Sequence, residues 1–366
     1  MRNRLRTFFV IGSLAAWPAA AQTLFVGTYT RGTGRPGIFA YRFDTTKATA
    51  LLLDSARSTN PSFLAPGRDG KMLYSVSEQG GGKGTVQAWR FRGGKLSFLN
   101  EVSSEGDDPC YVTIDKAGRN VIVANYSGGS LALFPVAPDG GVGPAEKIIA
   151  HAGSGPHRQQ QGPHVHSTVL SPDEDYVLAA DLGIDAVISY KYNSRRSTLS
   201  DSKKVNAFAA GSGPRHLEFH PKKAWVYVLQ ELSGTVTACR FRAGVLDTFQ
   251  TVRLLPEGAS APAHSADIHV SPDGRFLYAS NRNPTNHIAI FGIDPQTGML
   301  TLLGMQDTGG KVPRNFTIHP GGKWLLVGNQ DSDRINIFSI DKNSGLLTDT
   351  GKTIEVPSPV CLKWGE

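Results

Sequence analysis

The sequence predicts an all-β protein, a seven-bladed β-propeller with four antiparallel strands in each blade. Three observations lead to this prediction. A strand-turn-strand unit recurs six times, successive units start about 48 to 56 residues apart, and the two ends of the chain together supply a seventh unit. Periods of this length are typical of propellers, in which each unit packs only on its neighbours.

The repeated unit begins with a short alternating strand. A turn such as Ser271-Pro-Asp-Gly274 follows, and then a second strand rich in Val, Leu and Tyr. A third strand, such as Thr85-VQAWRF, and a weaker fourth strand, such as Leu300-TLLGMQ, complete the unit. The six central segments align without gaps: Pro61-SFLAPGRDGKMLYSVSE, Pro109-CYVTIDKAGRNVIVANY, Val165-HSTVLSPDEDYVLAADL, Pro214-RHLEFHPKKAWVYVLQE, Ser265-ADIHVSPDGRFLYASNR and Pro313-RNFTIHPGGKWLLVGNQ.

The two ends of the chain complete the seventh blade. Pro359-VCLKW matches the first strand of a unit, Leu24-FVGTYT the second and Gly37-IFAYRF the third. The C-terminal strand is therefore expected to pair with strands from the mature N-terminus. Such closure removes the free sheet edges and joins the ring.

The first 21 residues are typical of a secretory signal peptide. Basic residues at Met1–Arg6 precede an apolar run from Phe8 to Trp17 and an Ala19-Ala20-Ala21 ending. The run is too short for an ordinary membrane-spanning helix, although an uncleaved anchor remains the alternative. We expect a leader over residues 1–21, a single propeller domain over residues 22–366, a periplasmic or secreted location, and no membrane association after cleavage.

Charge and cysteine content narrow the classes of partner. The net charge of +7 includes three leader arginines, which leaves about +4 on the mature chain, and there is no Lys/Arg run. This charge is poor evidence for a nucleic-acid partner, and an anionic small molecule fits it equally well. The three cysteines do not suggest a disulfide framework, although one pair could form. We expect a monomer.

One rim of the propeller is expected to carry the functional site. The start of strand one and the end of strand two of every blade meet there, around one central mouth. The first column holds Ser62, Cys110, His166, Arg215, Ala266 and Arg314, and the second holds Glu78, Tyr126, Leu182, Glu231, Arg282 and Gln330, with Tyr29 from the closing blade. These residues differ from blade to blade, whereas a structural role would give similar residues in each.

The residue types in the mouth suit acid–base chemistry on an anionic substrate. Arginine offers fixed donors to carboxylate or phosphate. Glu231 and His166 are alternative candidates for proton transfer. We predict Glu231, His166, Arg215 and Arg282 as catalytic residues, and His164, Arg314, Glu78, His216 and His264 as substrate-binding residues. The alternative is a solvated rim in which Arg215 and Glu231 simply pair across their hairpin.

A metal site is the weaker interpretation of the histidines. His164 and His166 lie two residues apart on a predicted strand and could form half of a site, with His157 and His264 nearby. No carboxylate or cysteine at a fixed spacing completes the set. We therefore predict no metal and no cofactor.

With this repeat, the chain resembles the seven-bladed propeller lactonases related to 6-phosphogluconolactonase and, more distantly, the fungal muconate-lactonising enzymes. The motifs that carry the resemblance span nearly the whole mature chain: Leu24-FVGTYT, Gly162-PHVHS, Ala180-DLGID, Gly213-PRHLEFHP, Gln230-EL, Ala266-DIHVSPDGRFLYASNR and Arg314-NFTIHPGG.

The resemblance implies metal-independent hydrolysis of a sugar lactone by the His, Arg and Glu of these motifs, at His166 (or His164), Arg215, Glu231 and Arg282. We expect a small-molecule lactone or carboxylate as the partner and no nucleic acid. A leader peptide argues against a phosphorylated cytosolic intermediate and favours an unphosphorylated aldonolactone or a lactone from extracellular carbohydrate. Two other functions stay open: a non-catalytic periplasmic propeller that binds a ligand or a protein, and a muconate-type cycloisomerase whose arginines would clamp a dicarboxylate.

Overall fold

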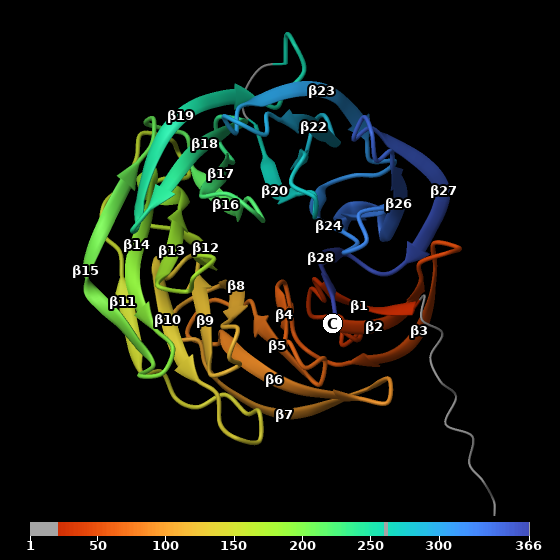
Figure 1. The fold of residues 1–366 in the computed structure, drawn as a ribbon. Coiled ribbons are helices and arrows are strands. Elements are labelled where there is room, and N and C mark those ends of the chain that lie inside the picture. Colours follow the sequence, from red (N-terminus) through yellow and green to blue (C-terminus); the bar gives the residue numbers. More distant parts are fainter. Residues whose placement is uncertain (1–20, 260–262, 366) are drawn as a thin grey trace, which may run out of the picture.

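The computed structural model describes residues 21–259 and 263–365. They form seven four-stranded antiparallel sheets arranged in a ring (Figure 1), so the predicted fold is confirmed. The expected leader lies outside the described residues except for Ala21, the first residue of strand β1. No helix in the described part of the chain is both long and apolar enough to cross a bilayer.

The blades are numbered here from the one that contains both ends of the chain. Blade 1 comprises β28 (Pro359–Trp364), β1 (Ala21–Thr28), β2 (Ile38–Asp44) and β3 (Thr49–Ala56); blade 2 comprises β4 (Leu64–Pro66), β5 (Met72–Ser77), β6 (Thr85–Arg92) and β7 (Lys95–Ser103); blade 3 comprises β8 (Pro109–Ile114), β9 (Asn120–Asn125), β10 (Ser130–Pro135) and β11 (Lys147–Ala150); blade 4 comprises β12 (Val165–Leu170), β13 (Tyr176–Asp181), β14 (Ala186–Asn193) and β15 (Thr198–Ala207), with the 3-10 turn η1 (Leu182–Ile184).

The remaining three blades follow the same order. Blade 5 comprises β16 (Pro214–Phe219), β17 (Trp225–Gln230), β18 (Thr235–Arg242) and β19 (Val245–Arg253); blade 6 comprises β20 (Ser265–Val270), β21 (Phe276–Asn281), β22 (His287–Ile293) and β23 (Leu300–Asp307); blade 7 comprises β24 (Pro313–Ile318), β25 (Trp324–Asn329), β26 (Arg334–Ile340) and β27 (Leu347–Glu355), with the 3-10 turn η2 (Gln330–Ser332).

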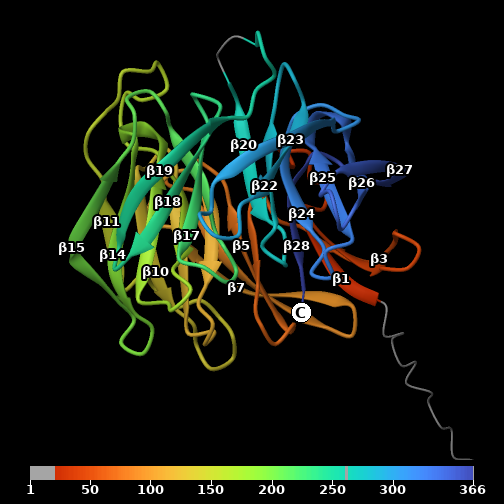
Figure 2. The same ribbon diagram turned by 45° about the horizontal axis from the view of Figure 1, so that its top comes forward.

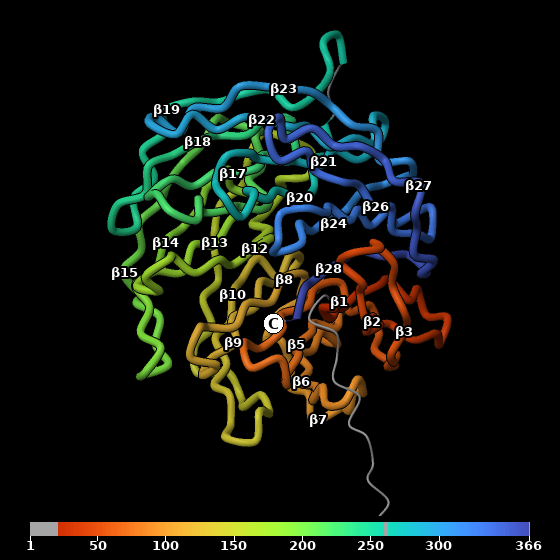
Figure 3. Tube along the Cα trace, turned by 45° about the vertical axis from the view of Figure 1, so that its right-hand side comes forward, coloured from red at the N-terminus to blue at the C-terminus, as the bar shows by residue number. Residues whose placement is uncertain are grey.

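The ring closes as the sequence predicts. Strand β28 pairs antiparallel with β1, with Leu24 opposite Trp364 and Val26 opposite Leu362. Figure 3 shows the C-terminal end beside β1, where the described part of the chain begins. Closure thus joins the two ends through backbone hydrogen bonds, with β28 as the innermost strand of blade 1.

The core lies between neighbouring blades. The second strands β9, β13, β17, β21 and β25 are buried over their full length, because each sheet is covered on both faces. One cluster, for example, joins Leu178 of blade 4 to Leu217 and Val226 of blade 5. The fourth strands, such as β23, lie on the outside of the ring (Figures 1 and 2) and are largely exposed. This packing fixes the first strands around the axis.

In most blades, a β-bulge near the start of the first strand changes the direction in which one side chain points. The ladder between strands one and two skips a single residue in five blades: Val360, Cys110, His166, Arg215 and Arg314. In blade 6 the skip covers Ala266 and Asp267. A bulged residue has no ladder partner and can turn away from its strand's regular alternation. Five of these bulge positions, Cys110, His166, Arg215, Ala266 and Arg314, belong to the column predicted to line the mouth.

Candidate active site

The bulged residues converge on one narrow cavity at the propeller axis. Its walls come from six blades, and the lining residues are Ser62, Phe63, Cys110, His166, Arg215, His216, Arg314, Asn315 and Val360. The first predicted column is therefore gathered at one place, except for Ala266. Phe63, His216 and Asn315 directly follow the column residues Ser62, Arg215 and Arg314, so blades 2, 5 and 7 each contribute two successive residues to the cavity.

A glycine turn brings Arg215 and Glu231 together. Gly213 has a φ of +66°, which glycine adopts without a Cβ clash. Its carbonyl accepts a hydrogen bond from the backbone N–H of Glu231 at 2.7 Å, and its own N–H donates to the Asp185 carboxylate at 2.8 Å. The start of β16 and the residue after β17 are thus held side by side.

Glu231 lies between two arginines. Its Oε1 is 2.7 Å from Nη2 of Arg282, and its Oε2 is 2.9 Å from Nε of Arg215. The side chains of Arg215, Glu231 and Arg282 are 2%, 8% and 14% exposed. Burial alone would raise the pKa of Glu231, but the charges of Arg282 and Arg215 lower it below its usual value. Glu231 is therefore ionised at neutral pH.

The guanidinium of Arg215 is fixed by several protein groups. Its Nη1 donates to the carbonyl of Ala266 and lies 3.2 Å from Nε2 of His216. Its contact with Glu231 is an ion pair that is not aligned as a hydrogen bond. Burial lowers the pKa of Arg215 to about 10, which keeps the group charged at neutral pH. Within the described residues, Nη2 makes no hydrogen bond to protein.

His216, predicted to bind substrate, has both ring nitrogens occupied by protein groups. Nε2 faces Arg215, and Nδ1 lies 2.7 Å from Oδ1 of Asp267. Burial, followed by the charge of Arg215, lowers the pKa of His216 to about 3, so the ring is neutral. Sequence reasoning did not single out Asp267, the second residue of the blade 6 bulge.

The histidines of blade 4 flank the ring of Tyr126. His164 stacks on it with ring centroids 4.4 Å apart, and His166 meets it edge-on at 5.3 Å. The pKa of His166 lies well below its usual value because of burial and the nearby charge of Arg215. A neutral imidazole in this position can accept a proton. Tyr126 belongs to the second predicted column, but no role was predicted for it.

Arg314 has a different environment from the other two arginines. Its guanidinium lies over the ring of Tyr29, 5.2 Å from the centroid, and the Tyr29 hydroxyl donates to Glu78 at 2.8 Å. Burial opposes the charge of Arg314, but Tyr29 and Glu78 raise its pKa. Arg314 makes no ion pair within residues 21–259 and 263–365. It is therefore the mouth arginine with the most freedom to bind an anion.

His264 borders the mouth from blade 6. Its carbonyl accepts hydrogen bonds from the backbone N–H and from Nε of Arg282, both at 3.0 Å. The structure thus brings the nine predicted residues to the axial mouth or its border. No group of three or more His, Cys, Asp and Glu side chains in the described ranges is arranged to hold a metal ion.

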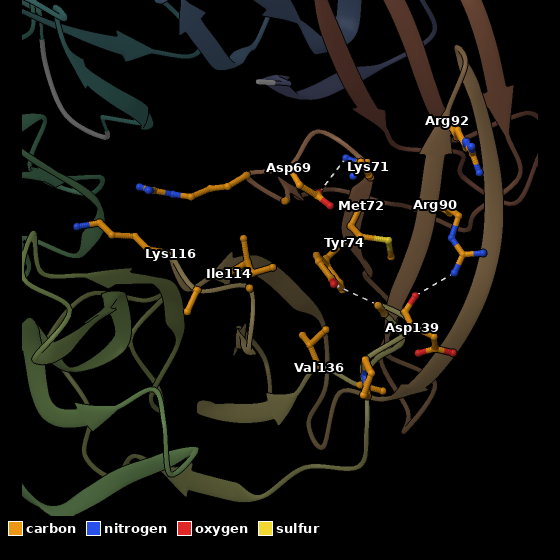
Figure 4. Close-up of a pocket in the computed structure, with 17 residues that line it drawn as sticks. Asp69, Lys71, Met72, Tyr74, Arg90, Arg92, Ile114, Lys116, Val136 and Asp139 are labelled. Carbon is orange, nitrogen blue, oxygen red and sulfur yellow. Dashed lines mark hydrogen bonds between the residues drawn. The ribbon is translucent and has the colours of Figure 1, made fainter.

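A much larger cavity, of about 720 Å³, lies at the opposite rim between blades 2 and 3 (Figure 4). The turns between the first two strands of these blades form part of its wall. Its cationic side chains are exposed: Arg68, Lys71, Arg90, Arg92 and Lys116. Figure 4 shows Lys116 on one side and Arg90 and Arg92 on the other. None of them forms an ion pair with a described carboxylate.

Comparison with known proteins gives a consistent result. The family model described as "Lactonase, 7-bladed beta-propeller" matches residues 23–364. A Bacillus subtilis protein named 6-phosphogluconolactonase is 37% identical over 345 residues, which cover 93% of this chain and 97% of that protein. A Formosa agariphila protein of the same name is 37% identical over 332 residues, covering 88% and 94% of the two chains.

A solved structure agrees with these relatives. The periplasmic gluconolactonase PpgL of Pseudomonas aeruginosa has a TM-score of 0.89 and 37% identity, covering 94% of this chain and 99% of that one. The family model and the relatives extend over the full ring of blades, and the fold has the matching number of blades. The chain therefore belongs to the seven-bladed β-propeller lactonase family.

Proposed function

We propose that this chain is a hydrolase that opens a sugar lactone at the axial mouth of the propeller. The observation that carries the proposal is the cluster of Arg215, Glu231 and Arg282 at the mouth, in which Arg215 and Glu231 are buried. A buried carboxylate with two fixed cations is costly to maintain for stability alone. The names of the relatives from B. subtilis and P. aeruginosa support the same reaction class.

The proposed reaction is attack of water on the lactone carbonyl. A base takes one proton from the water as its oxygen bonds to the carbonyl carbon, and the oxyanion forms. Collapse of this intermediate breaks the ring C–O bond, and the leaving oxygen takes up a proton to give the hydroxy acid. Glu231 or His166 is the base. The pKa values of both groups lie below their usual ranges, so both are weak bases. Each therefore accepts the water proton only in the transition state, when bonding to the carbonyl carbon makes the water more acidic.

The arginines supply the electrostatic part of the mechanism. We assign to Nη2 of Arg215 and to Arg282 the stabilisation of the developing oxyanion, because buried fixed donors act strongly on new charge. We assign to Arg314 the binding of an anionic or strongly polar part of the substrate, with Glu78, His164 and His264 at the border. Since two arginines share Glu231, the mouth is poorly suited to clamping a dicarboxylate, which argues against a cycloisomerase.

We further propose that the substrate is an unphosphorylated aldonolactone and that the protein acts in the periplasm or outside the cell. The signal-like first 21 residues support export. A phosphorylated pentose-pathway lactone is not expected there. The similarity to a protein named as a periplasmic gluconolactonase supports the same substrate class.

The test is proton release from glucono-δ-lactone and from its 6-phosphate, each measured with a pH indicator against the spontaneous rate. We expect acceleration for both and a higher kcat/KM for the unphosphorylated lactone. A preference for the phosphate ester would contradict the proposed substrate. Binding of the lactone without any acceleration would point to the non-catalytic alternative, and conversion of a muconate-type acid would point to a cycloisomerase.

A further inference from the structure

Polar groups of blades 5, 6 and 7 form a hydrogen-bonded set that begins at Arg215. Asp267 is its central member and is only 2% exposed. Its Oδ1 contacts Nδ1 of His216 at 2.7 Å. Its Oδ2 accepts hydrogen bonds from Asn315 Nδ2 at 2.5 Å, from the backbone N–H of Phe316 at 3.1 Å and from Nε2 of His269 at 3.1 Å. A fully satisfied carboxylate of this kind is held in one orientation.

The contacts of His216 determine which of its ring nitrogens carries the proton. Guanidinium nitrogens only donate, so Nε2 of His216 must accept from Nη1 of Arg215 and carries no proton. The single ring proton is then on Nδ1, where it is donated to Asp267. The low pKa of His216 fits this neutral form.

Each N–H of the Arg215 end group then has a defined partner or direction. The two N–H bonds of Nη1 are taken by His216 and by the Ala266 carbonyl. The Nε side faces Glu231. Nη2 remains as the part of the guanidinium without a protein acceptor in the described ranges, and Arg215 lines the axial cavity.

We propose that Asp267 and His216 are positioning residues: Asp267 fixes the Nδ1–H tautomer of His216, whose Nε2 holds Arg215 so that Nη2 faces the reacting lactone. This inference rests on the proposed function of the mouth. It gives His216 a role as a support for Arg215 in place of the direct substrate contact expected from the sequence. Neither residue exchanges a proton with substrate.

A substitution at Asp267 should act through this tautomer. In Asp267→Asn, the amide oxygen is favoured on the side of Asn315 and the Phe316 N–H, because both are donors. The amide NH2 then faces Nδ1 of His216, which must become an acceptor. The ring proton moves to Nε2 and opposes the N–H of Arg215, so the guanidinium loses its support.

The first measurement is ¹⁵N NMR of the full-length protein labelled at histidine. We expect His216 to show a protonated Nδ1 and an unprotonated Nε2 between pH 6 and 8, and the opposite pattern in Asp267→Asn. The imidazole signals that are missing from His216→Phe are those of His216. A protonated Nε2 or a doubly protonated ring in the wild type would overturn the inference. This measurement does not depend on turnover, so it stands even if the lactone assay fails.

The second measurement is the steady-state kinetics of three variants. We expect His216→Phe and Asp267→Asn to lower kcat by about 10- to 100-fold with KM changed less than threefold, because a small misplacement of a transition-state donor has that effect. His216→Gln keeps an acceptor for Arg215 and should recover part of the loss. His287→Gln is the control: His287 is the first residue of β22 in blade 6, the blade of Asp267, and it is also buried, but its Nε2 bonds the carbonyl of Leu254.

The outcomes separate the two proposals. If the wild type accelerates no lactone, the proposed function fails. If the wild type is active and His216→Phe keeps its kcat, or loses no more than His287→Gln of equal thermal stability, the positioning role fails. Equal losses in His216→Phe and His216→Gln would also contradict it, because the acceptor would then be irrelevant.

Discussion

Two regions of this propeller collect arginines, and they differ in burial and pairing. At the axial mouth, the buried Arg215 and the half-buried Arg282 both contact Glu231, and Arg314 packs on Tyr29. In the cavity between blades 2 and 3, Arg90 and the other cations are exposed. Asp69 and Asp139 line that cavity too, but their Oδ1 atoms accept backbone N–H bonds within their own turns.

Neither the size of a cavity nor its number of cations identifies a catalytic site in this propeller. Exposed guanidinium groups are solvated, and their interaction with an anion is weak and screened by salt. Buried ones are fixed by the surrounding protein and act in a low-dielectric environment. The smaller cavity at the axis is therefore the better candidate for catalysis.

The largest effect is expected from Glu231→Gln. This variant keeps the side-chain shape but removes the charge that Arg215 and Arg282 share, and with it a candidate base. We expect kcat to fall by about 10³-fold or more. Folding should persist, with a lower Tm, because the buried Arg215 and the half-buried Arg282 lose their partner.

The control for Glu231→Gln is Asp115→Asn. Asp115 is also a buried carboxylate, but it accepts hydrogen bonds from Tyr192 and Ser194 at 2.6 Å and lies at the opposite rim. It should lower stability while the kcat of the folded protein stays the same. Unchanged hydrolysis in Glu231→Gln would remove Glu231 from the mechanism.

Arg314→Gln should have the second-largest effect. Because Arg314 makes no ion pair in the described part of the chain, its loss leaves no buried carboxylate unpaired. We expect KM to rise about 10- to 100-fold, the usual worth of one charged hydrogen bond, with a smaller change in kcat. Initial-rate kinetics over a wide lactone range measure this. A fall in kcat at constant KM would place Arg314 in the chemical step.

A stability experiment tests the ion pairs that His269 makes with Asp267 and Glu218. Burial would lower the pKa of His269, but Asp267 and Glu218 raise it from 6.5 to about 9. Its stabilising contribution is therefore complete below pH 6.5 and is lost as the pH rises towards 9. We expect the free energy of unfolding to fall by on the order of 2 kcal/mol over this window in the wild type. Urea unfolding of His269→Gln should lack this fall; equal alkaline losses in both proteins would contradict the ion pair.

The smallest effect is expected at the opposite rim. The double variant Arg90→Ser and Arg92→Ser removes two exposed cations from the larger cavity and breaks no ion pair within the described residues. Its kcat/KM for the lactone should stay within about twofold of the wild type, as is usual for such surface positions. A tenfold loss would show that the larger cavity contributes to hydrolysis.

The fold could be predicted almost completely from the sequence, because each blade repeats the same strand and turn pattern. The closure of blade 1 followed from Pro359-VCLKW and Leu24-FVGTYT, and the β28–β1 pairing confirms it. The expected monomer, the leader and the location remain predictions.

The sequence left open whether two of the three cysteines form a disulfide. In the structure all three are buried and unpaired.

For the site, the sequence could predict only which aligned positions of the repeats face the mouth. Aligned repeats indicated that Arg215, Glu231 and Arg282 face one mouth. They did not indicate the bulges, because a bulge changes hydrogen bonding without a distinct residue pattern. Without the bulge, regular alternation would turn Arg215 and His216 to opposite faces. The role of Asp267 was missed for the same reason, since the skip in blade 6 spans two residues.

The most direct test is a crystal structure of Glu231→Gln soaked with glucono-δ-lactone. The variant should hydrolyse the lactone slowly enough for the sugar, as lactone or acid, to be observed. We predict density at the axial mouth, with a carbonyl or carboxylate oxygen within hydrogen-bond distance of Arg215 or Arg314. Sugar bound only between blades 2 and 3, with the mouth empty, would contradict the account.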